Sequence, residues 1–341
     1  MTLNFPADPG AQSPVNTYGP DSTPLSTDNG VLYTWDGDKW VANKQISYDG
    51  RYVNVTGDTM TGDLTVPSLN GGQLAGFRNQ LINGDFRVWQ RGISNTANGI
   101  RYVADRWNAQ TSASAGINRQ TAPQDLPCPF VMQFATDGQG FRQGIELFQN
   151  NAGDGLNGPF IPGSTWTISF YCNKDVSAIA PVIAFRSVVY DTAGEVRVDD
   201  SPPNWSAVGS AISGFQRYKC TITIGAGKIP ANGHNQLAVV FIPSSVNMEA
   251  DTRVTGCQFE PGPVATPFEH RPIGTELALC QRYFQALQVR RINAETSWYT
   301  MPTKMRDRPI GSAEVGTVYD DSFGITAGTA GRVDITLDAE L

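Results

Sequence analysis

Residues 50–66, GRYVNVTGDTMTGDLTV, contain the triplet Thr-Gly-Asp twice, at Thr56-Gly57-Asp58 and at Thr61-Gly62-Asp63. Gly-Asp steps punctuate an extended chain without ending it. Apolar residues alternate around these steps: Val53, Val55, Met60, Leu64 and Val66. A segment this short cannot bury such an edge alone, whereas identical chains wound about a shared axis can. The pattern favours a self-associating β segment; an ordinary hairpin inside a globular domain is the alternative.

The rest of the chain is rich in turn residues and poor in charge. Charged residues make up 17% of the 341 residues, against about 25% in ordinary soluble domains, and there are 35 Gly and 22 Pro. Strand-like runs recur: Phe130–Phe134, Trp166–Cys172, Val182–Tyr190, Tyr218–Ile224, Leu237–Ile242 and Thr255–Phe259. Many short strands without a helical period predict an all-β fold, a β-sandwich.

One helix is expected, starting near Thr275, which can cap its N-terminus, with Glu276 in the first turn. Its apolar face is expected to carry Leu277, Cys280, Phe284 and Leu287. Beyond it, Ser297–Met301 and the stretch 312–337 are expected to form strands. We therefore predict a small β cap after the helix.

The N-terminal region predicts a proline-rich arm over residues 5–30, either disordered or lying as a strap on a neighbouring protein, and then a hairpin. In GVLYTWDGDKW, apolar residues alternate up to an Asp-Gly turn, and Trp35 and Trp40 are expected to pack across the strands. The core of such a hairpin is too small to stand alone, so it should dock on another surface. Asp36 and Asp38 supply too few carboxylates for a calcium site.

Charge and cysteine usage exclude several function classes. The net charge of −7 argues against non-specific nucleic-acid binding, and no apolar run reaches the roughly 20 residues of a membrane span. No signal peptide is visible. Five widely spaced cysteines without a CxxC motif indicate buried thiols made in a reducing cytoplasm. The two histidines, His234 and His270, lack ligand partners at helical spacing, so we expect no metal and no cofactor.

The sequence shows no catalytic signature. It lacks a G-x-S-x-G motif, a P-loop and a nucleotide fingerprint. Asp199-Asp200 and Asp320-Asp321 are adjacent, and adjacent residues of a strand face opposite ways. We therefore expect a protein that is not an enzyme.

Glycan binding fits the sequence better, because it needs exposed aromatic faces beside polar side chains. The candidate site lies in DDSPPNWSAVG and its surroundings: Trp205, Asp199, Asp200, Asn204 and Tyr190. Trp298 and Tyr299 come next. Core packing of each aromatic residue is the alternative.

Four segments resemble fibre and other structural proteins of tailed bacteriophages. GDTMTGDLT resembles their threefold β stalk, and GVLYTWDGDKW is similar to N-terminal segments in structural proteins of marine cyanophages. NQLINGDFRVWQRG with ADRW, and CQFEPGPVATPFEHRPIGTELALCQRYF, resemble the start and end of a jelly-roll domain of phage virion proteins. Ion pairs are expected to close that end of the sandwich, between the arginines Arg87, Arg91 and Arg106 and the acids Asp85, Asp105 and Glu269.

The resemblance implies a homotrimer with four parts: an attachment arm and hairpin (1–45), a trimeric β stalk (46–75), a jelly roll (76–275), and the helix and cap (276–341). Tyr33, Trp35 and Trp40 would attach the chain to other virion proteins, and the five alternating apolar residues of 50–66 would form the trimer interface. The expected function is recognition of host surface polysaccharide, in a virion assembled in the host cytoplasm. A capsid, collar or tail decoration without a receptor role is the alternative, and a polysaccharide depolymerase is a third.

Overall fold

The computed structural model describes residues 31–35, 40–45, 77–95, 99–111, 116–135, 138–149, 156–157, 160–187, 192–230, 236–291, 297–305, 310–311, 315–318, 322–325 and 331–340. Several residues named above lie outside these ranges: Val53, Val55, Met60, Leu64, Val66, Tyr190, His234 and Asp320-Asp321. The predicted stalk and its interface therefore remain predictions.

The chain divides into two compact units, Met1–Thr65 and Val66–Leu341. In the first, β1 (Val31–Trp35) and β2 (Trp40–Gln45) pair antiparallel, with Trp35 opposite Trp40. This pairing confirms the hairpin predicted from the Asp-Gly turn and the alternating apolar residues.

The second unit contains two antiparallel sheets. The seven-stranded sheet has the order β14 (Ser206–Ile212), β15 (Phe215–Thr223), β11 (Thr165–Cys172), β17 (Thr252–Pro261), β7 (Phe130–Phe134), β6 (Ile117–Thr121) and β3 (Ser94–Asn95). The six-stranded sheet has the order β13 (Val196–Arg197), β12 (Val182–Arg186), β16 (Gln236–Met248), β8 (Gly138–Glu146), β5 (Asn108–Thr111) and β4 (Gly99–Tyr102). A short pair, β9 (Phe148–Gln149) and β10 (Leu156–Asn157), stands apart.

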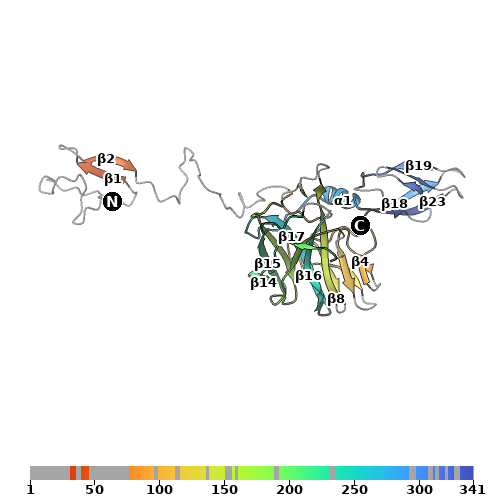
Figure 1. Cartoon of the computed structure of the whole chain (residues 1–341), viewed down its shortest axis with the longest axis horizontal. Coiled ribbons are helices and arrows are strands. Elements are labelled where there is room, and N and C mark those ends of the chain that lie inside the picture. Colours follow the sequence, from red (N-terminus) through yellow and green to blue (C-terminus); the bar gives the residue numbers. More distant parts are fainter. Residues whose placement is uncertain are drawn as a thin grey trace. The chain divides into compact units, whose positions relative to one another are not determined.

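From β7 onward the chain crosses repeatedly between the two sheets (Figure 1), although β12 and β13 stay in the six-stranded sheet and β14 and β15 stay in the seven-stranded one. The spatial orders β7-β17-β11-β15 and β8-β16-β12-β13 bring together strands that are far apart in the sequence. This winding is that of an eight-stranded jelly roll, extended at its edges by β3, β6 and β14 and by β4 and β5. The predicted all-β sandwich is confirmed.

The sandwich core is dominated by aromatic rings from both sheets. Phe141 on β8 stacks on Phe241 of β16 with ring centroids 5.0 Å apart, and its edge meets Phe170 of β11 at 6.0 Å. Trp107 packs on the same two β8 and β16 rings at 5.8 and 5.6 Å. Such pairs add about 0.5–1.5 kcal/mol each beyond the burial of their surface, which makes this cluster the centre of the fold.

The predicted helix exists but starts earlier and is shorter than expected. Helix α1 spans Ile273–Gln281, and its N-cap is Pro272, with no side-chain cap hydrogen bond. The expectation that Thr275 caps the helix is therefore wrong: proline pre-sets the backbone for a helix start, and the chain is already helical three residues later. Phe284 and Leu287 do not lie on the helix but on the strand that follows.

The residues after α1 form the predicted β cap, built from two three-stranded sheets. One has the order β18 (Phe284–Arg291), β23 (Gly331–Asp338) and β20 (Ile310–Gly311), and the other β19 (Ser297–Thr300), β22 (Ser322–Ile325) and β21 (Val315–Val318). The cap has its own apolar cluster: Met301, Met305, Phe323, Ile335, Leu337 and Ala339. A hydrogen bond of 2.7 Å from Ala339 N to Tyr283 O ties its last strand to the end of the helix.

Candidate functional site

The predicted sugar-stacking residue, Trp205, lies in the core. Its side chain is 2% exposed, its ring stacks on Phe241 at 6.0 Å and meets the edge of Phe170 at 4.7 Å, and Nε1 donates to the carbonyl of Phe241 at 3.2 Å. A ring enclosed on these sides cannot offer a face to a sugar. The assignment of Trp205 to glycan binding is therefore wrong.

The polar residues predicted beside Trp205 stay at the surface and order their own loop. Asp199 accepts a hydrogen bond of 2.9 Å from the amide of Ser201, and exposed Asp200 pairs with Lys228 at 2.5 Å. Asn204 is exposed. Without an aromatic platform, the loop loses the feature on which its assignment as a glycan site depended.

The two segments that resemble the ends of a phage jelly roll, 79–92 and 257–284, meet at one end of the sandwich. Glu269 from the second segment accepts hydrogen bonds from the backbone amides of Phe77 and Asn79, the latter at 2.5 Å. Both carboxyl oxygens are thus engaged by a stretch that forms no strand. A buried backbone outside regular structure needs such partners, and Glu269 supplies two of them.

Asn79 continues this network through its side chain. Its Oδ1 accepts from the amides of Leu81 and Phe259, both at 3.0 Å, and its Nδ2 donates to the carbonyl of Cys257 at 3.1 Å. Asn79 therefore joins the incoming chain to strand β17 with three hydrogen bonds from one buried amide group.

Asn83, four residues further along the chain, also joins distant backbone segments through its side chain. Its backbone is in the left-handed region, with φ at 58°, a conformation that asparagine tolerates better than most residues. Its side chain exchanges hydrogen bonds with the backbone of Val88 at 2.8 and 3.0 Å and donates to the carbonyl of Asp105 at 3.0 Å. Its own amide donates to Glu276 of helix α1, which explains why that residue is buried rather than free at the helix start.

Arg271 lies at the centre of the junction. It donates to the carbonyls of Asn79 and Leu81, the latter at 3.0 Å, and it lies 3.8 Å from Glu269 and 3.5 Å from Glu276. One guanidinium thus joins both segments and the helix. Arg271 was not predicted from the sequence as a site residue; its signal is a run of three charged or titratable residues, Glu-His-Arg, inside an otherwise apolar stretch.

The expected arginine–carboxylate pairs are found in part. Two of them form as predicted: Arg87–Asp85 at 2.5 Å and Arg91–Asp105 at 3.9 Å. Arg106 instead pairs with Glu340 at 3.3 Å, from the end of the cap. The third predicted acid, Glu269, lies 3.8 Å from Arg271 instead, and both residues hydrogen-bond to the backbone of Asn79.

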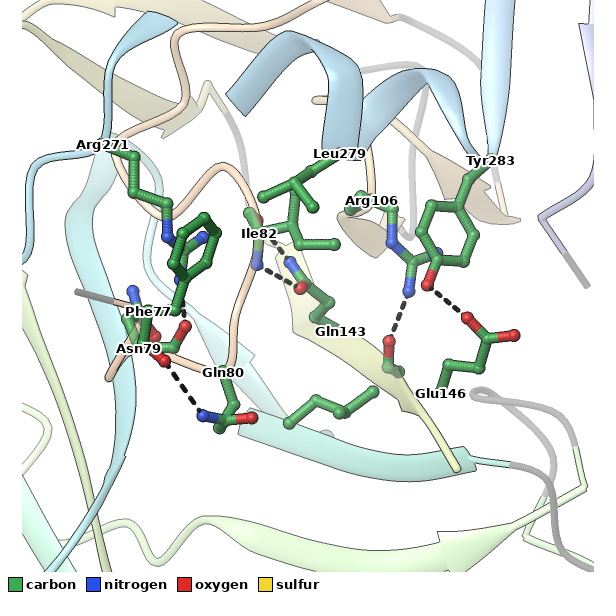
Figure 2. Close-up of a pocket in the computed structure, with 12 residues that line it drawn as sticks. Phe77, Asn79, Gln80, Ile82, Arg106, Gln143, Glu146, Arg271, Leu279 and Tyr283 are labelled. Atoms are coloured by element: carbon green, nitrogen blue, oxygen red, sulfur yellow. Dashed lines mark hydrogen bonds between the residues drawn. The ribbon is translucent and has the colours of Figure 1, made fainter. Parts of the chain in front are cut away.

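A cavity of about 280 Å³ opens beside this junction. It is lined by Phe77, Asn79, Gln80, Ile82, Arg106, Gln143, Gly144, Ile145, Glu146, Arg271, Leu279 and Tyr283. Figure 2 shows Phe77 and Arg271 at one end, and Arg106, Tyr283 and Glu146 at the other. Ile82, Leu279 and Gln143 lie between the two ends, and the Gln143 side chain exchanges hydrogen bonds of 2.7 and 2.8 Å with the backbone of Ile82.

The charged groups of the cavity are already paired. The Arg106 guanidinium lies 3.5 Å from the ring centre of Tyr283, donates to the carbonyl of Gly144 and pairs with Glu340. The Tyr283 hydroxyl donates to Glu146 at 3.0 Å. Burial raises the pKa of Tyr283 above its ordinary value, so its hydroxyl stays protonated. These contacts suit a structural junction better than proton transfer.

The described residues contain no group of three His, Cys, Asp or Glu side chains that could hold a metal ion. All five cysteines are free and buried, and burial raises the pKa of each thiol, which removes the thiolate that a nucleophile requires. In the described part of the chain, no helix has the length and apolar content needed to cross a bilayer.

Comparison with known proteins adds little to this picture. No protein-family model matches the chain, and no curated protein matches it. Among solved structures, the chain is similar to an arabinose-bound GH51 α-L-arabinofuranosidase, at 12% sequence identity and a TM-score of 0.26. The match covers 51% of this chain and 26% of the enzyme's chain, so the chain spans about a quarter of that protein. A similarity this low gives no sign of catalysis in either direction.

Proposed function

We propose that the chain is a homotrimeric fibre protein of a tailed-bacteriophage virion, assembled in the host cytoplasm, that recognises host surface polysaccharide without cutting it. The observation that carries the proposal is the contact between the two segments that resemble the ends of a phage jelly roll, 79–92 and 257–284. Asn79, Glu269 and Arg271 join them in one buried network. A resemblance that covers a whole domain requires this kind of contact between its two ends.

The N-terminal hairpin supports an attachment role. It consists of two strands, and a lone two-stranded hairpin is marginally stable in water. We therefore assign Tyr33, Trp35 and Trp40 to contact with another virion protein. Residues 46–75 would join three chains through the alternating apolar side chains around Met60, and three copies of a weak glycan site would strengthen adsorption through avidity.

The mass of the intact chain in dilute buffer tests the assembly. We expect three copies by native mass spectrometry, and we expect Met60→Asp to weaken the trimer because it places a charge on an apolar axis. Thr59→Asp is the matched control, since it adds the same charge at the neighbouring polar position. A monomeric parent chain, or equal assembly of the two variants, would contradict the proposal.

Binding to isolated surface polysaccharide from a set of marine cyanobacteria tests recognition, with reducing sugar measured in the same samples. We expect binding to some polysaccharides and no release of reducing sugar. Sugar release would indicate a depolymerase. A trimer that joins virions and binds none of the polysaccharides would indicate a capsid, collar or tail component without a receptor role.

A further inference from the structure

Phe77 is held in place by its neighbours and is nevertheless left largely uncovered by the described residues. Its side chain is 59% exposed, although Glu269 accepts a hydrogen bond from its amide and the Arg271 guanidinium lies 5.3 Å from its ring centre. Its φ is 58°, a conformation that is unfavourable for a bulky residue and persists only where the surroundings impose it. The protein therefore fixes an apolar ring without burying it.

The cavity described above begins at this ring (Figure 2). Much of its polar lining is buried and bonded within the protein: Asn79, Arg106, Gln143 and Arg271 each donate a hydrogen bond to a backbone carbonyl. These groups hold the walls of the cavity together. A polar ligand would have to displace existing hydrogen bonds in order to use them.

The lining residues that keep exposed surface are mostly apolar. They are Phe77, Gln80, Ile82, Ile145, Glu146 and Leu279. Of the two polar members, Glu146 already accepts from Arg282 and Tyr283, both at 3.0 Å. Gln80 donates to two backbone carbonyls at 3.3 Å. A fixed aromatic ring beside a cavity with three partly exposed aliphatic side chains is typical of a surface that contacts another protein.

The position of Phe77 in the chain indicates which protein makes this contact. The predicted stalk, residues 46–75, ends two positions before it. Two residues span at most about 7 Å, so three chains joined through their stalks would bring their Phe77 rings close to one axis. The surface nearest to each ring is then the same end of another copy. The stalk belongs to the proposed function, and the inference rests on it.

We propose that Phe77 of each copy packs into the cavity of a second copy, against Ile82, Ile145 and Leu279. The exposed part of the ring and the cavity are different surfaces, so the contact is heterologous, and such contacts form a closed ring when the rotation between copies fits. Three copies around one stalk provide that rotation. Each copy thus contributes one residue to its neighbour's cavity, which is complete only in the assembly.

Photochemical cross-linking of the intact chain tests the contact. Phe77→benzoylphenylalanine keeps an aromatic ring at this position, so the variant should fold and assemble as the parent does. Irradiation should give covalent dimers and trimers on a denaturing gel, with the cross-link at Ile82, Ile145 or Leu279. Ile212→benzoylphenylalanine is the control, because that exposed side chain ends strand β14 and does not line the cavity; it should give single chains only.

Thiol labelling measures whether the cavity is covered. The five native cysteines are buried, so Gln80→Cys adds one reactive thiol at the cavity. This thiol should react roughly tenfold more slowly, or slower still, in the trimer than in the monomeric fraction of Met60→Asp, because it is reached only when the contact opens. Ile212→Cys should react equally fast in both.

Three outcomes would overturn the contact: no cross-link from position 77, cross-links only within one chain or to another protein, or equal labelling of Gln80→Cys in trimer and monomer. If the parent chain is still a trimer, the fibre proposal stands. Cross-links from position 77 to the cavity in an assembly of another copy number would support the contact and overturn the threefold stalk. A parent chain that is a monomer would overturn both.

Discussion

Replacing Trp205 by alanine distinguishes a core residue from a ligand-binding one. The indole is 2% exposed, stacks on Phe241, meets the edge of Phe170 and donates one hydrogen bond. Replacing a buried Phe or Trp by alanine lowers the free energy of unfolding by about 3–5 kcal/mol. For a domain of about 200 residues, in which 1 kcal/mol shifts the melting temperature by about 2–4 °C, a loss of about 4 kcal/mol lowers it by roughly 8–16 °C.

Differential scanning calorimetry measures this shift, and the neighbouring Asn204 provides the control. Asn204 is exposed, so Asn204→Ala should change stability by less than about 0.5 kcal/mol. Trp205→Phe should fall between the two, because it keeps a ring in the core and loses the hydrogen bond. If Trp205→Ala melts at the same temperature as Asn204→Ala, the ring does not hold the core and our account of this position is wrong.

Three further outcomes follow from buried contacts. A Cβ at Gly84 would lie 2.2 Å from the carbonyl oxygen of Cys257, so Gly84→Ala should lower the melting temperature sharply, while Gly274→Ala, with nothing within 4 Å, should not. The five thiols should resist a thiol reagent in the folded chain and give five equivalents after denaturation; rapid labelling of the folded chain would contradict their burial. Burial raises the pKa of Glu340 above its ordinary value of 4.5, so its contribution to stability is full below that pH and is lost as the pH rises through the folded pKa. Urea unfolding measures this effect: as the pH rises from 4.5 to 8, the free energy of unfolding should fall less for Glu340→Gln than for the parent. An equal fall in the two proteins would refute this role of Glu340.

The strands were predictable because local pattern decides them. The run Phe130–Phe134 matches β7 residue for residue, and Trp166–Cys172 misses one residue of β11. Both runs combine apolar residues with flanking turns, and that signal survives in the fold. The start of the helix was placed two residues too late, since Thr275 looked like a cap while Pro272 already set the backbone.

The candidate sites were less predictable, because they depend on contacts between distant residues. Trp205 sits among Asp, Pro and Asn, a composition typical of an exposed loop, but composition does not determine which way one ring points. Arg271 lies in a loop, where an arginine is ordinarily solvated. It is buried and donates to the carbonyls of Asn79 and Leu81, which come from a distant part of the chain, and no local pattern contains that information.

The side chain of Glu340 is wholly buried and pairs with Arg91 and Arg106 at the end of the sandwich. This pairing has a consequence for biosynthesis. The last jelly-roll strand ends at Pro261, and Glu340 leaves the ribosome about 80 residues later, which takes roughly 4–16 s at ordinary elongation rates. During that interval a nascent chain can fold its sandwich while both arginines still lack this carboxylate. This end of the sandwich is therefore completed in two steps: the sandwich folds first, and Glu340 pairs with Arg91 and Arg106 only after the cap has been translated.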